Sequence, residues 1–351
     1  MSTLLFNGAL LVAEATLILS LRRHLVRTLA AELVLGVGIT AAVAGLALVR
    51  FGGESMFGLA RLWAWAIFLH GPLLLSFIAW RSGSTNRRLR WVSASSAVVI
   101  VAVAADAFLI EPHWIEVSRV TIASAEIEVP TRLVLVADLQ ADHVGEYERH
   151  ALELVMAETP DAILFAGDYV HLPEREARVQ HEVLAQLLEE VGLEAPLGIY
   201  AVGGNTDAPG WERIFNRIEA HTFTEGGRVQ AGELVITGLT FPQSFEAGTL
   251  VEDAPGFHIV LGHAPDFALR EVEADLLLAG HCHGGQVRLP FFGPPVILSR
   301  VPRKWTSGAH EISPGKTLVV SRGVGMERAR APRLRFLCSP ELVVIDLVPR
   351  D

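Results

Sequence analysis

Apolar residues are crowded into the first third of this chain. They form four runs with few charges, at about Leu4–Leu21, Leu29–Val49, Phe57–Trp80 and Trp91–Ile110. Each run approaches the roughly 20 residues that an α-helix needs to cross the hydrocarbon of a bilayer. The runs lack the alternation of a membrane β-barrel, so helices are the predicted way to satisfy their backbone groups in lipid. We therefore expect residues 1–112 to form a membrane domain with four transmembrane helices.

The two parts of the chain also differ in charge. Residues 1–112 contain nine arginines, no lysine and five acidic residues, whereas the remainder contains 20 basic and 34 acidic residues. The arginines concentrate in the first and third loops between the runs, at 22–27 and 81–90, and the positive-inside rule places these loops in the cytoplasm. We therefore expect a multi-pass cell membrane protein whose large acidic part lies outside the cytoplasm. That part has no basic tract, so nucleic acid is not an expected partner.

Three ionisable residues lie within or near the apolar runs, namely Glu14, His70 and Asp106. Ionisable groups in a membrane are candidates for function. The other interpretation is that they form interhelical hydrogen bonds or lie near the headgroups. We favour this second interpretation because no two of the three form a recognisable relay in the sequence.

From about Val117 the pattern becomes that of a soluble α/β domain, which we place at residues 113–351. Short apolar segments alternate with amphipathic segments predicted as helices at Tyr147–Glu158 and Ala177–Val191, and this alternation predicts a layered α/β fold. The later strands follow one another with less helix between them, which indicates a second sheet packed on the first. The predicted strands are Arg132–Ala137, Asp161–Ala166, Leu197–Val202, Leu234–Leu239, Phe257–Leu261, Asp275–Leu278, Thr317–Val320 and Leu342–Leu347.

Residues of metal-ligand type follow five of these strands. In open α/β sheets, ligands bind beyond the carboxyl ends of the strands. A single such residue is usually a cap or a turn former, but five in succession are hard to explain in that way. Carboxylate, amide and imidazole groups suit Mn, Fe or Zn, and two such ions near each other would clamp the oxygens of a phosphoryl transfer. The five residues are Asp138, Asp168, Asn205, His263 and His281.

The segment from Gly280 to Gln286 carries the strongest single signal. His281 and His283 are two positions apart, so they project to one side only where the backbone bends. Glycines on both flanks allow that bend. Cys282 is either a soft metal ligand or a buried apolar residue, and we favour burial because its side chain should point away from the shared side.

Taken together, these residues resemble the calcineurin-like metallophosphoesterases, and the segments Gly284–Pro290 and Ser321–Gly325 look like the membrane-associated, YkuE-like branch of that family. That family shows Asp-x-His, Gly-Asp, Gly-Asn-His-Asp/Glu, Gly-His and Gly-His-x-His in this order. The order and the wide spacing match from about Thr131 to Leu347. The corresponding motifs are Asp138-Leu139-Gln140, Gly167-Asp168, Gly204-Asn205-Thr206-Asp207, Gly262-His263 and Gly280-His281-Cys282-His283.

The resemblance implies a four-layer αββα sandwich with two divalent metal ions between its loops, of type Mn, Fe or Zn. Asp168 would bridge the ions, which would together make a water molecule acidic enough to attack phosphorus. Asp138 and His283 would complete the first site, with Gln140 as a further candidate at the position of a usual histidine ligand, and Asn205, His263 and His281 would complete the second. Asp168, Asn205, Asp207 and His171 are the predicted catalytic residues. Arg288 and Arg322 are predicted to hold phosphate oxygens, or else to form structural ion pairs.

Two departures from the family pattern affect the chemistry. Gln140 replaces a usual histidine ligand, and an amide oxygen binds metal more weakly and favours harder ions, so we expect a weaker first site, filled by Mn²⁺, unless Asp142 or His143 takes over as ligand. Thr206 replaces the histidine that helps to protonate the leaving oxygen, and its hydroxyl is too weak an acid for that role. Either the leaving group is already good, or His143 or His171 supplies the proton. In the second case His171→Ala would slow the hydrolysis of poor leaving groups most.

Two functions from different classes remain. The first is a membrane-tethered hydrolase of a phosphoester or pyrophosphate, with a phosphorylated small molecule or a lipid-linked phosphate as substrate. The second is a degenerate, non-catalytic domain that binds a ligand and signals through the membrane helices. Gln140 and Thr206 favour the second, whereas six intact ligand positions favour the first. The apolar stretch Pro290–Leu298 is either a lipid-facing wall or a packed loop.

Overall fold

The computed structural model describes residues 2–20, 38, 41, 45, 55–246 and 250–350. The chain divides into two compact units. One contains Met1–Leu109 and Arg330–Arg333, and the other contains Ile110–Ala329 and Leu334–Asp351.

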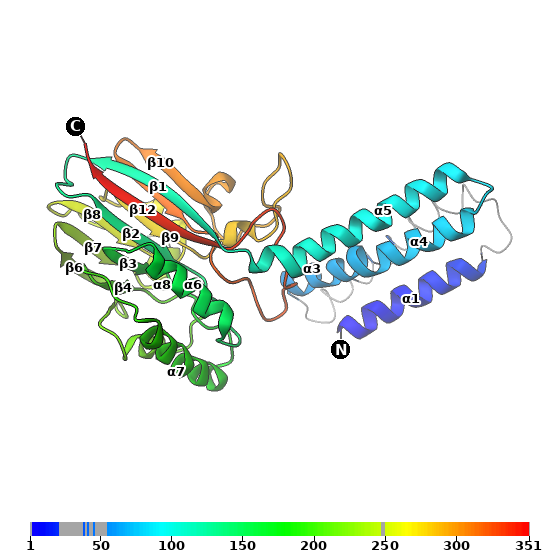
Figure 1. Cartoon of the computed structure of the whole chain (residues 1–351), viewed down its shortest axis with the longest axis horizontal. Coiled ribbons are helices and arrows are strands. Elements are labelled where there is room, and N and C mark those ends of the chain that lie inside the picture. The colour runs from blue at the N-terminus through cyan, green and yellow to red at the C-terminus, as the bar shows by residue number, and fades with distance from the viewer. Residues whose placement is uncertain are drawn as a thin grey trace. The chain divides into compact units, whose positions relative to one another are not determined.

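The described residues from Ser2 to His113, of which those from Ile110 onward belong to the second unit, are helical apart from Ser55 and the turn at 83–86 (Figure 1). Among these residues, the continuous helical segments Met56–Ser82 and Arg87–His113 are long and apolar enough to cross a membrane. The apolar part of α1, Thr3–Ala15, is shorter than a span, and the second predicted run lies almost entirely outside the described residues. Four transmembrane helices therefore stay a prediction. The elements are α1 (Ser2–Ser20), α3 (Met56–Trp65), a π-helical turn (Ala66–His70), α4 (Gly71–Ser82), α5 (Arg87–Ala105), a second π-helical turn (Asp106–Ile110) and a 3₁₀ turn (Glu111–His113).

A buried polar group joins α1 to the first π-helical turn. Oε1 of Glu14 lies 3.0 Å from Nδ1 of His70, and Oδ1 of Asn7 lies 3.1 Å from Nε2 of the same ring. His70 and Glu14 are both buried, so the network satisfies polar groups that would be costly to leave unpaired in an apolar bundle. The interpretation of these residues as interhelical hydrogen-bond partners is thus confirmed for Glu14 and His70.

The second unit contains two six-stranded sheets within its described residues. The order of the first sheet is β1-β12-β2-β3-β4-β5, and that of the second is β10-β11-β9-β8-β7-β6. The first sheet consists of β1 (Glu116–Ser124), β2 (Thr131–Val136), β3 (Ala162–Phe165), β4 (Ile199–Ala201), β5 (His221–Thr222) and β12 (Glu341–Pro349). The second consists of β6 (Gly227–Ala231), β7 (Leu234–Gly238), β8 (Phe257–Leu261), β9 (Leu276–Ala279), β10 (Gly308–Ser313) and β11 (Lys316–Val320).

Alternating side chains divide the core into layers. On β2, Leu133 and Leu135 face the core between the sheets, whereas Val134 and Val136 face the helices α6 (Glu146–Ala157) and α7 (Glu174–Val191). Figure 1 shows these two helices on one face of the first sheet. The outer face of the second sheet packs against the 3₁₀ turns Pro265–Leu269 and Arg303–Thr306, and α8 (Phe241–Phe245) contacts the first of these turns. The two-sheet α/β fold is confirmed, while a full helical fourth layer stays a prediction.

Parallel pairing places the predicted ligands at common edges. Strands β2, β3 and β4 are parallel neighbours, and so are β7, β8 and β9, with β11 parallel to β9. The carboxyl ends within each set therefore point the same way, which is where ligand-binding loops gather in α/β sheets. The last strand, β12, does not join the second sheet but inserts between β1 and β2 of the first.

Candidate metal centre

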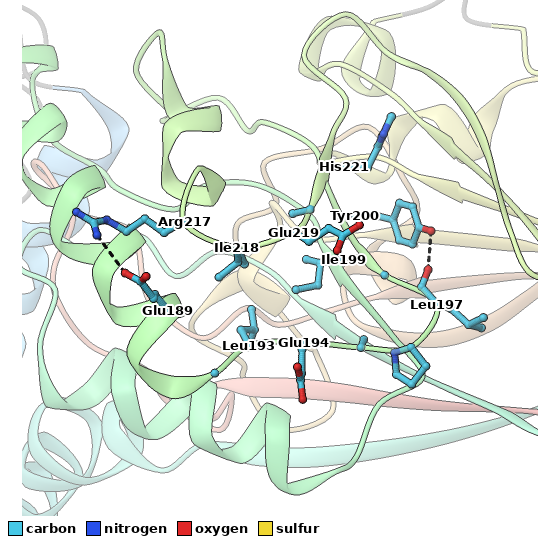
Figure 2. A pocket seen from close by; sticks show the side chains of 15 residues that line it. Glu189, Leu193, Glu194, Leu197, Ile199, Tyr200, Arg217, Ile218, Glu219 and His221 are labelled. Carbon is cyan, nitrogen blue, oxygen red and sulfur yellow. Dashed lines mark hydrogen bonds and ion pairs between the residues drawn. The ribbon is translucent and has the colours of Figure 1, made fainter.

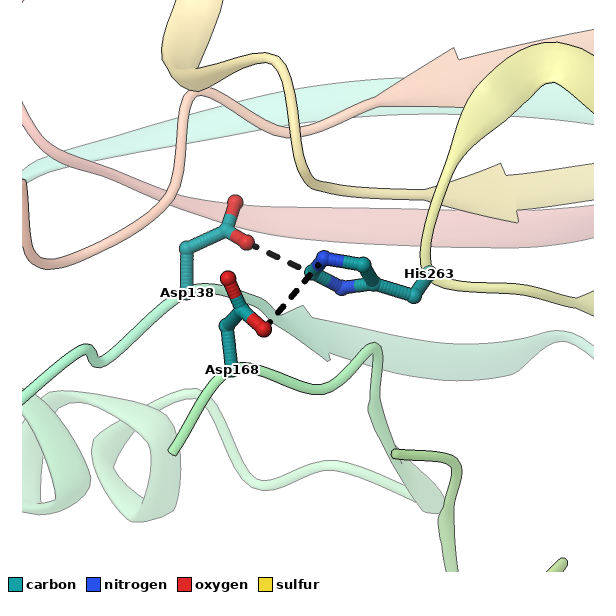
Figure 3. Close-up of side chains that lie close together, drawn as sticks. All are labelled: Asp138, Asp168 and His263. Atoms are coloured by element: carbon teal, nitrogen blue, oxygen red, sulfur yellow. Dashed lines mark ion pairs between the residues drawn. The ribbon is translucent and has the colours of Figure 1, made fainter. Parts of the chain in front are cut away.

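Loops from both sheets bring three ligand-type side chains together. Asp138 follows β2, Asp168 follows β3 and His263 follows β8, and each offers a ligand atom within 4.8 Å of the other two (Figure 3). All three side chains are buried. Residues that are 125 positions apart in the sequence, from 138 to 263, therefore meet at the facing edges of the two sheets.

The backbone at these positions is strained. Five of the predicted ligands have positive φ angles, namely Asp138 at 51°, Gln140 at 40°, Asp168 at 58°, His281 at 67° and His283 at 47°. Non-glycine residues rarely adopt this conformation, and it costs of the order of 1 kcal/mol per residue. Backbone hydrogen bonds between the loops hold this conformation in place. Gln140 N–H donates to the Asp168 carbonyl at 2.8 Å, and Asp138 N–H donates to the Gly167 carbonyl at 3.0 Å. Strain of this kind is typical of functional sites.

The imidazole rings of His263 and His281 point nitrogen lone pairs toward each other. Nδ1–H of His263 donates to the Ala166 carbonyl at 2.6 Å, and Nε2–H of His281 donates to the Leu298 carbonyl at 3.1 Å. A carbonyl oxygen can only accept, so these contacts fix the tautomer of each neutral ring. The remaining nitrogens, Nε2 of His263 and Nδ1 of His281, then lie 3.2 Å apart as two acceptors. Two facing acceptors repel each other unless a cation lies among them.

Two further acceptor atoms lie close to Nε2 of His263. Nε2 of His263 lies 3.1 Å from Oδ1 of Asn205, in the loop after β4, and 3.4 Å from Oδ1 of Asp168. A proton on His263 would satisfy only part of this group, whereas a metal ion accepts electron pairs from all four atoms. These four residues are the set predicted for the second metal.

The set predicted for the first metal contains buried polar atoms without partners. Both ring nitrogens of His283, and Oε1 of Gln140, have no hydrogen-bond partner among the described residues. Nε2 of Gln140 donates to Oδ2 of Asp168 at 2.8 Å, so its orientation is fixed. Leaving such groups unpaired costs about 1–3 kcal/mol each. Bound cations would remove this cost, and the residues present therefore fit a metal centre.

The pKa values of the buried groups also suit a metal centre. Burial, together with the negative charge of Asp168, raises the pKa of Asp138 well above its ordinary value. Burial also acts to raise the pKa of Asp168, but His263 and hydrogen bonds from Thr206 N–H and Gln140 hold it below its ordinary value. Burial and the neighbouring His263 lower the pKa of His281 to about 4, so this ring is neutral and able to bind metal near neutral pH.

The carboxylate of Asp207 holds the backbone of neighbouring loops. Its carboxylate accepts backbone N–H groups from Asp168 at 2.8 Å, Tyr169 at 2.7 Å and Gly204 at 2.8 Å. It thereby ties the loop after β3 to the loop after β4. The carboxylate therefore holds the backbone of Asp168 and Gly204, and a catalytic role for Asp207 stays a prediction.

The two predicted phosphate-binding arginines already have protein partners. Arg288 donates to the Gly284 carbonyl at 3.2 Å and to Oγ of Ser307 at 2.9 Å. Arg322 pairs with Glu116 at 2.8 Å and Glu341 at 3.1 Å. The ion pairs of Arg322 match the structural alternative, whereas Arg288 donates to neutral oxygens, and phosphate binding by either residue stays a prediction.

Asp142, His143 and His171, which could take over from the histidines that are absent at 140 and 206, differ in their contacts and exposure. Asp142 lies 3.9 Å from the guanidinium of Arg328, and His143 is exposed on the surface. Nδ1 of His171 lies 3.5 Å from Oε1 of Glu327. Cys282 is buried in the core cluster on the outer face of the second sheet, and burial raises the pKa of its thiol, as expected for an apolar role.

Sequence reasoning missed two residues of the centre. Glu327 and Arg328 follow β11, and Nε of Arg328 donates to the Gln140 carbonyl at 2.8 Å. Burial and the charge of Asp168 raise the pKa of Glu327 to about 7. The sequence did predict the strand Thr317–Val320 that precedes both residues, but its parallel pairing with β9, which brings its carboxyl end to this edge, is seen only in the structure.

Glu327 should make the stability of the metal-free protein depend on pH. Its pKa rises from 4.5 in the unfolded chain to about 7 in the fold, so folding loses stability as the pH rises through this window. Relative to the wild type, Glu327→Gln should therefore gain up to about 3 kcal/mol at high pH and little at low pH. The measurement is the difference in Tm between the two proteins at about pH 5 and about pH 8. An exposed control, Glu225→Gln, should show no such dependence. A Tm difference for Glu327→Gln that is equal at both pH values would contradict the assignment.

A surface hollow of about 940 Å³ lies elsewhere. Figure 2 shows its wall, which includes Glu189 at the end of α7, the loop from Leu193 to Leu197, and His221 of β5. Glu189 is paired with Arg217 at 3.0 Å. The hollow contains none of the predicted ligands, and the chemistry described above does not involve it.

Comparison with known proteins gives a consistent result. A family model described as calcineurin-like phosphoesterase matches residues 131–285. An uncharacterized metallophosphoesterase, YkuE of Bacillus subtilis, is 30% identical over 260 residues, which cover 68% of this chain and 87% of that protein. Phosphodiesterase YaeI of Escherichia coli is 27% identical, over 68% of this chain and 90% of its own length. An uncharacterized metallophosphoesterase of Aquifex aeolicus is 28% identical, over 68% of this chain and 94% of its own length.

Proposed function

Because the chain belongs to the calcineurin-like metallophosphoesterases, which hydrolyse phosphoester bonds, we propose that it is a membrane-tethered hydrolase of phosphoester or pyrophosphate bonds that uses two divalent metal ions. The observation that carries the proposal is the pair of facing imidazole lone pairs beside Asp168 and Asn205, next to the unpaired His283 and Gln140. Divalent metals are common to the family, and the number of ions is our inference from these two donor groups.

Each ion would have its own ligands. Asp138, Gln140 and His283 would hold the first, and Asn205, His263 and His281 the second, with Asp168 shared. When bound, two divalent ions would make a water molecule nucleophilic and neutralise charge on the phosphate oxygens. Mn²⁺ suits the oxygen-rich first group, whereas the second, with two imidazoles, suits Mn, Fe or Zn equally well.

The protein's own residues would orient the reacting groups. Asp207 fixes the backbone of Asp168, and Thr206 N–H donates to Oδ1 of Asp168 at 2.9 Å. The Thr206 hydroxyl is no acid at neutral pH, so we assign the proton of the leaving oxygen to His171. That ring lies in the loop just after Asp168 and faces Glu327.

The substrate class follows from the family and the helices. The Escherichia coli relative is named a phosphodiesterase, which favours a diester. The two apolar helical segments support attachment to a membrane, and we propose that the phosphoesterase unit acts outside the cytoplasm on an amphiphilic, lipid-linked phosphate. The intact donor set argues against the non-catalytic alternative.

Hydrolysis of a generic aryl phosphodiester tests the proposed function. The full chain, purified in detergent and loaded with Mn²⁺, should hydrolyse this substrate, and removal of the metal with a chelator should reduce the rate by about 10³-fold or more. Re-addition of Mn²⁺ should restore it, which separates metal loss from unfolding. A metal-loaded chain that binds Mn²⁺ but hydrolyses neither diesters nor pyrophosphates would contradict the proposal.

A further inference from the structure

An aromatic loop projects from the phosphoesterase unit between its last histidine ligand and the 3₁₀ turn at Arg303. We call residues 289–296 the aromatic loop. Phe291 is 112% exposed, Phe292 56%, Leu289 45% and Val296 39%. Single exposed apolar residues are normal, but a contiguous group with two phenylalanines marks a binding surface.

Hydrogen bonds within the aromatic loop and contacts with Arg303 fix its conformation. Leu289 and Gly293 exchange two backbone hydrogen bonds of 2.9 Å, which close a tight hairpin. Phe291, at its tip, has a φ of 64°, which a phenylalanine adopts only where the surrounding structure imposes it. The guanidinium of Arg303 lies 4.5 Å from the centre of the Phe292 ring and also donates to the Pro294 carbonyl.

The charge of this region is opposite to that of the rest of the unit. Residues 276–310 contain no acidic residue but include Arg288, Arg300, Arg303 and Lys304, although the chain as a whole carries a net charge of −10. Arg300 and Lys304 are exposed. Exposed aromatic groups beside basic residues match the interface of an anionic membrane, where rings enter the headgroup layer and cations meet the phosphates.

The aromatic loop is connected to the metal centre at its carboxyl end. The Leu298 carbonyl accepts the hydrogen bond from His281, and Asp266 accepts Ser299 Oγ–H at 2.6 Å and Arg300 N–H at 2.9 Å. The guanidinium of Arg300 lies 5.4 Å from the centre of the Phe245 ring, and that ring lies 5.8 Å from the ring of His281. A basic and aromatic path therefore leads from the exposed surface to the ligands.

We propose that the aromatic loop inserts Phe291 and Phe292 into the interface of an anionic phospholipid membrane, with Arg300 and Lys304 on the headgroup phosphates. The contact presents a lipid phosphoester to the metal centre. This use of the contact rests on the proposed function, but the membrane contact itself does not.

Spin labelling of the full chain tests the contact directly. The two native cysteines, Cys282 and Cys338, are buried, so Phe291→Cys can be labelled selectively. With the full chain reconstituted in phosphatidylcholine vesicles containing phosphatidylglycerol, a nitroxide at 291 should be more accessible to oxygen than to a water-soluble nickel chelate. A label at exposed Val179 of α7, from Val179→Cys, is the control and should show the reverse. Equal access of the nickel chelate to both labels would overturn the proposal.

Activity provides a second measurement. The Phe291→Ser, Phe292→Ser double variant should hydrolyse a phospholipid diester in these vesicles about tenfold more slowly, since about 1.4 kcal/mol of interface binding is lost. Its rate on a soluble aryl phosphodiester should equal that of wild type and of the control Val179→Ser. Equal rates of the double variant and wild type on both substrates would contradict presentation by the loop. Failure of wild type on both substrates would contradict the proposed function, while the label at 291 still reports the membrane contact.

Discussion

Asp168→Ala should reduce phosphodiester hydrolysis by about 10³-fold or more in the Mn²⁺-loaded chain. Oδ1 of Asp168 lies 3.4 Å from Nε2 of His263 and accepts Thr206 N–H, while Oδ2 accepts from Gln140. The carboxylate thus stands between the two donor groups. Loss of this carboxylate should therefore weaken the binding of both metal ions at once.

Asp168→Asn is the matched variant for this experiment. It keeps the shape of the side chain and removes the charge, so a folded Asp168→Asn protein should be as inactive as the alanine variant. The exposed carboxylate Asp253, replaced by alanine, serves as the control and should leave the rate unchanged. An Asp168→Asn protein within tenfold of the wild-type rate would contradict a shared ligand.

Arg335→Met should reduce the stability of the phosphoesterase unit by about 3–5 kcal/mol. Arg335 has no exposed surface, and its guanidinium donates to the carbonyls of Arg322, Gly323, Gly325 and Cys338. Methionine fills similar space but has no donor, so it would leave these buried carbonyls unpaired. The result should be a Tm about 10 °C lower, measured by tryptophan fluorescence of the full chain in detergent.

The arginine also supports the metal centre indirectly. Gly325 N–H donates to the Asp138 carbonyl at 2.6 Å, and the Cys338 thiol donates to the His283 carbonyl at 3.3 Å. Arg335→Met should therefore weaken Mn²⁺ binding as well as stability. Arg175→Met, at an exposed position of α7, should change Tm by less than about 2 °C. A similarly small change for Arg335→Met would show that the carbonyls find other partners.

The parts of the fold with strong local patterns were predictable. Apolar runs at β2, β3, β8 and β9 mark buried strands, and the polar residue after each run marks the ligand edge. β1 was missed because it is half exposed along its length, and β5 because it has only two residues. The insertion of β12 between β1 and β2 depends on long-range pairing, which leaves no local signal.

The candidate site was predictable as a set of residues but not as a set of contacts. Order and spacing indicated the aspartates and histidines, whereas the tautomers of His263 and His281 depend on carbonyls at 166 and 298, remote in the sequence. Arg335 could not be recognised, because arginine is usually a surface residue and its four carbonyl partners come from the folded loops. Gln140 was identified as a departure, and the structure adds that its amide nitrogen bonds Asp168 while its oxygen stays available.

The metal stoichiometry of the folded chain tests most directly whether two ions share Asp168. Metal-free protein in detergent is titrated with Mn²⁺ in a calorimeter, and a crystal of the loaded protein is measured at the manganese absorption edge. We expect two ions per chain, with Asp168 between them, Asp138 and His283 beside one, and His263 and His281 beside the other. A single ion, or two ions of which neither touches Asp168, would contradict this expectation.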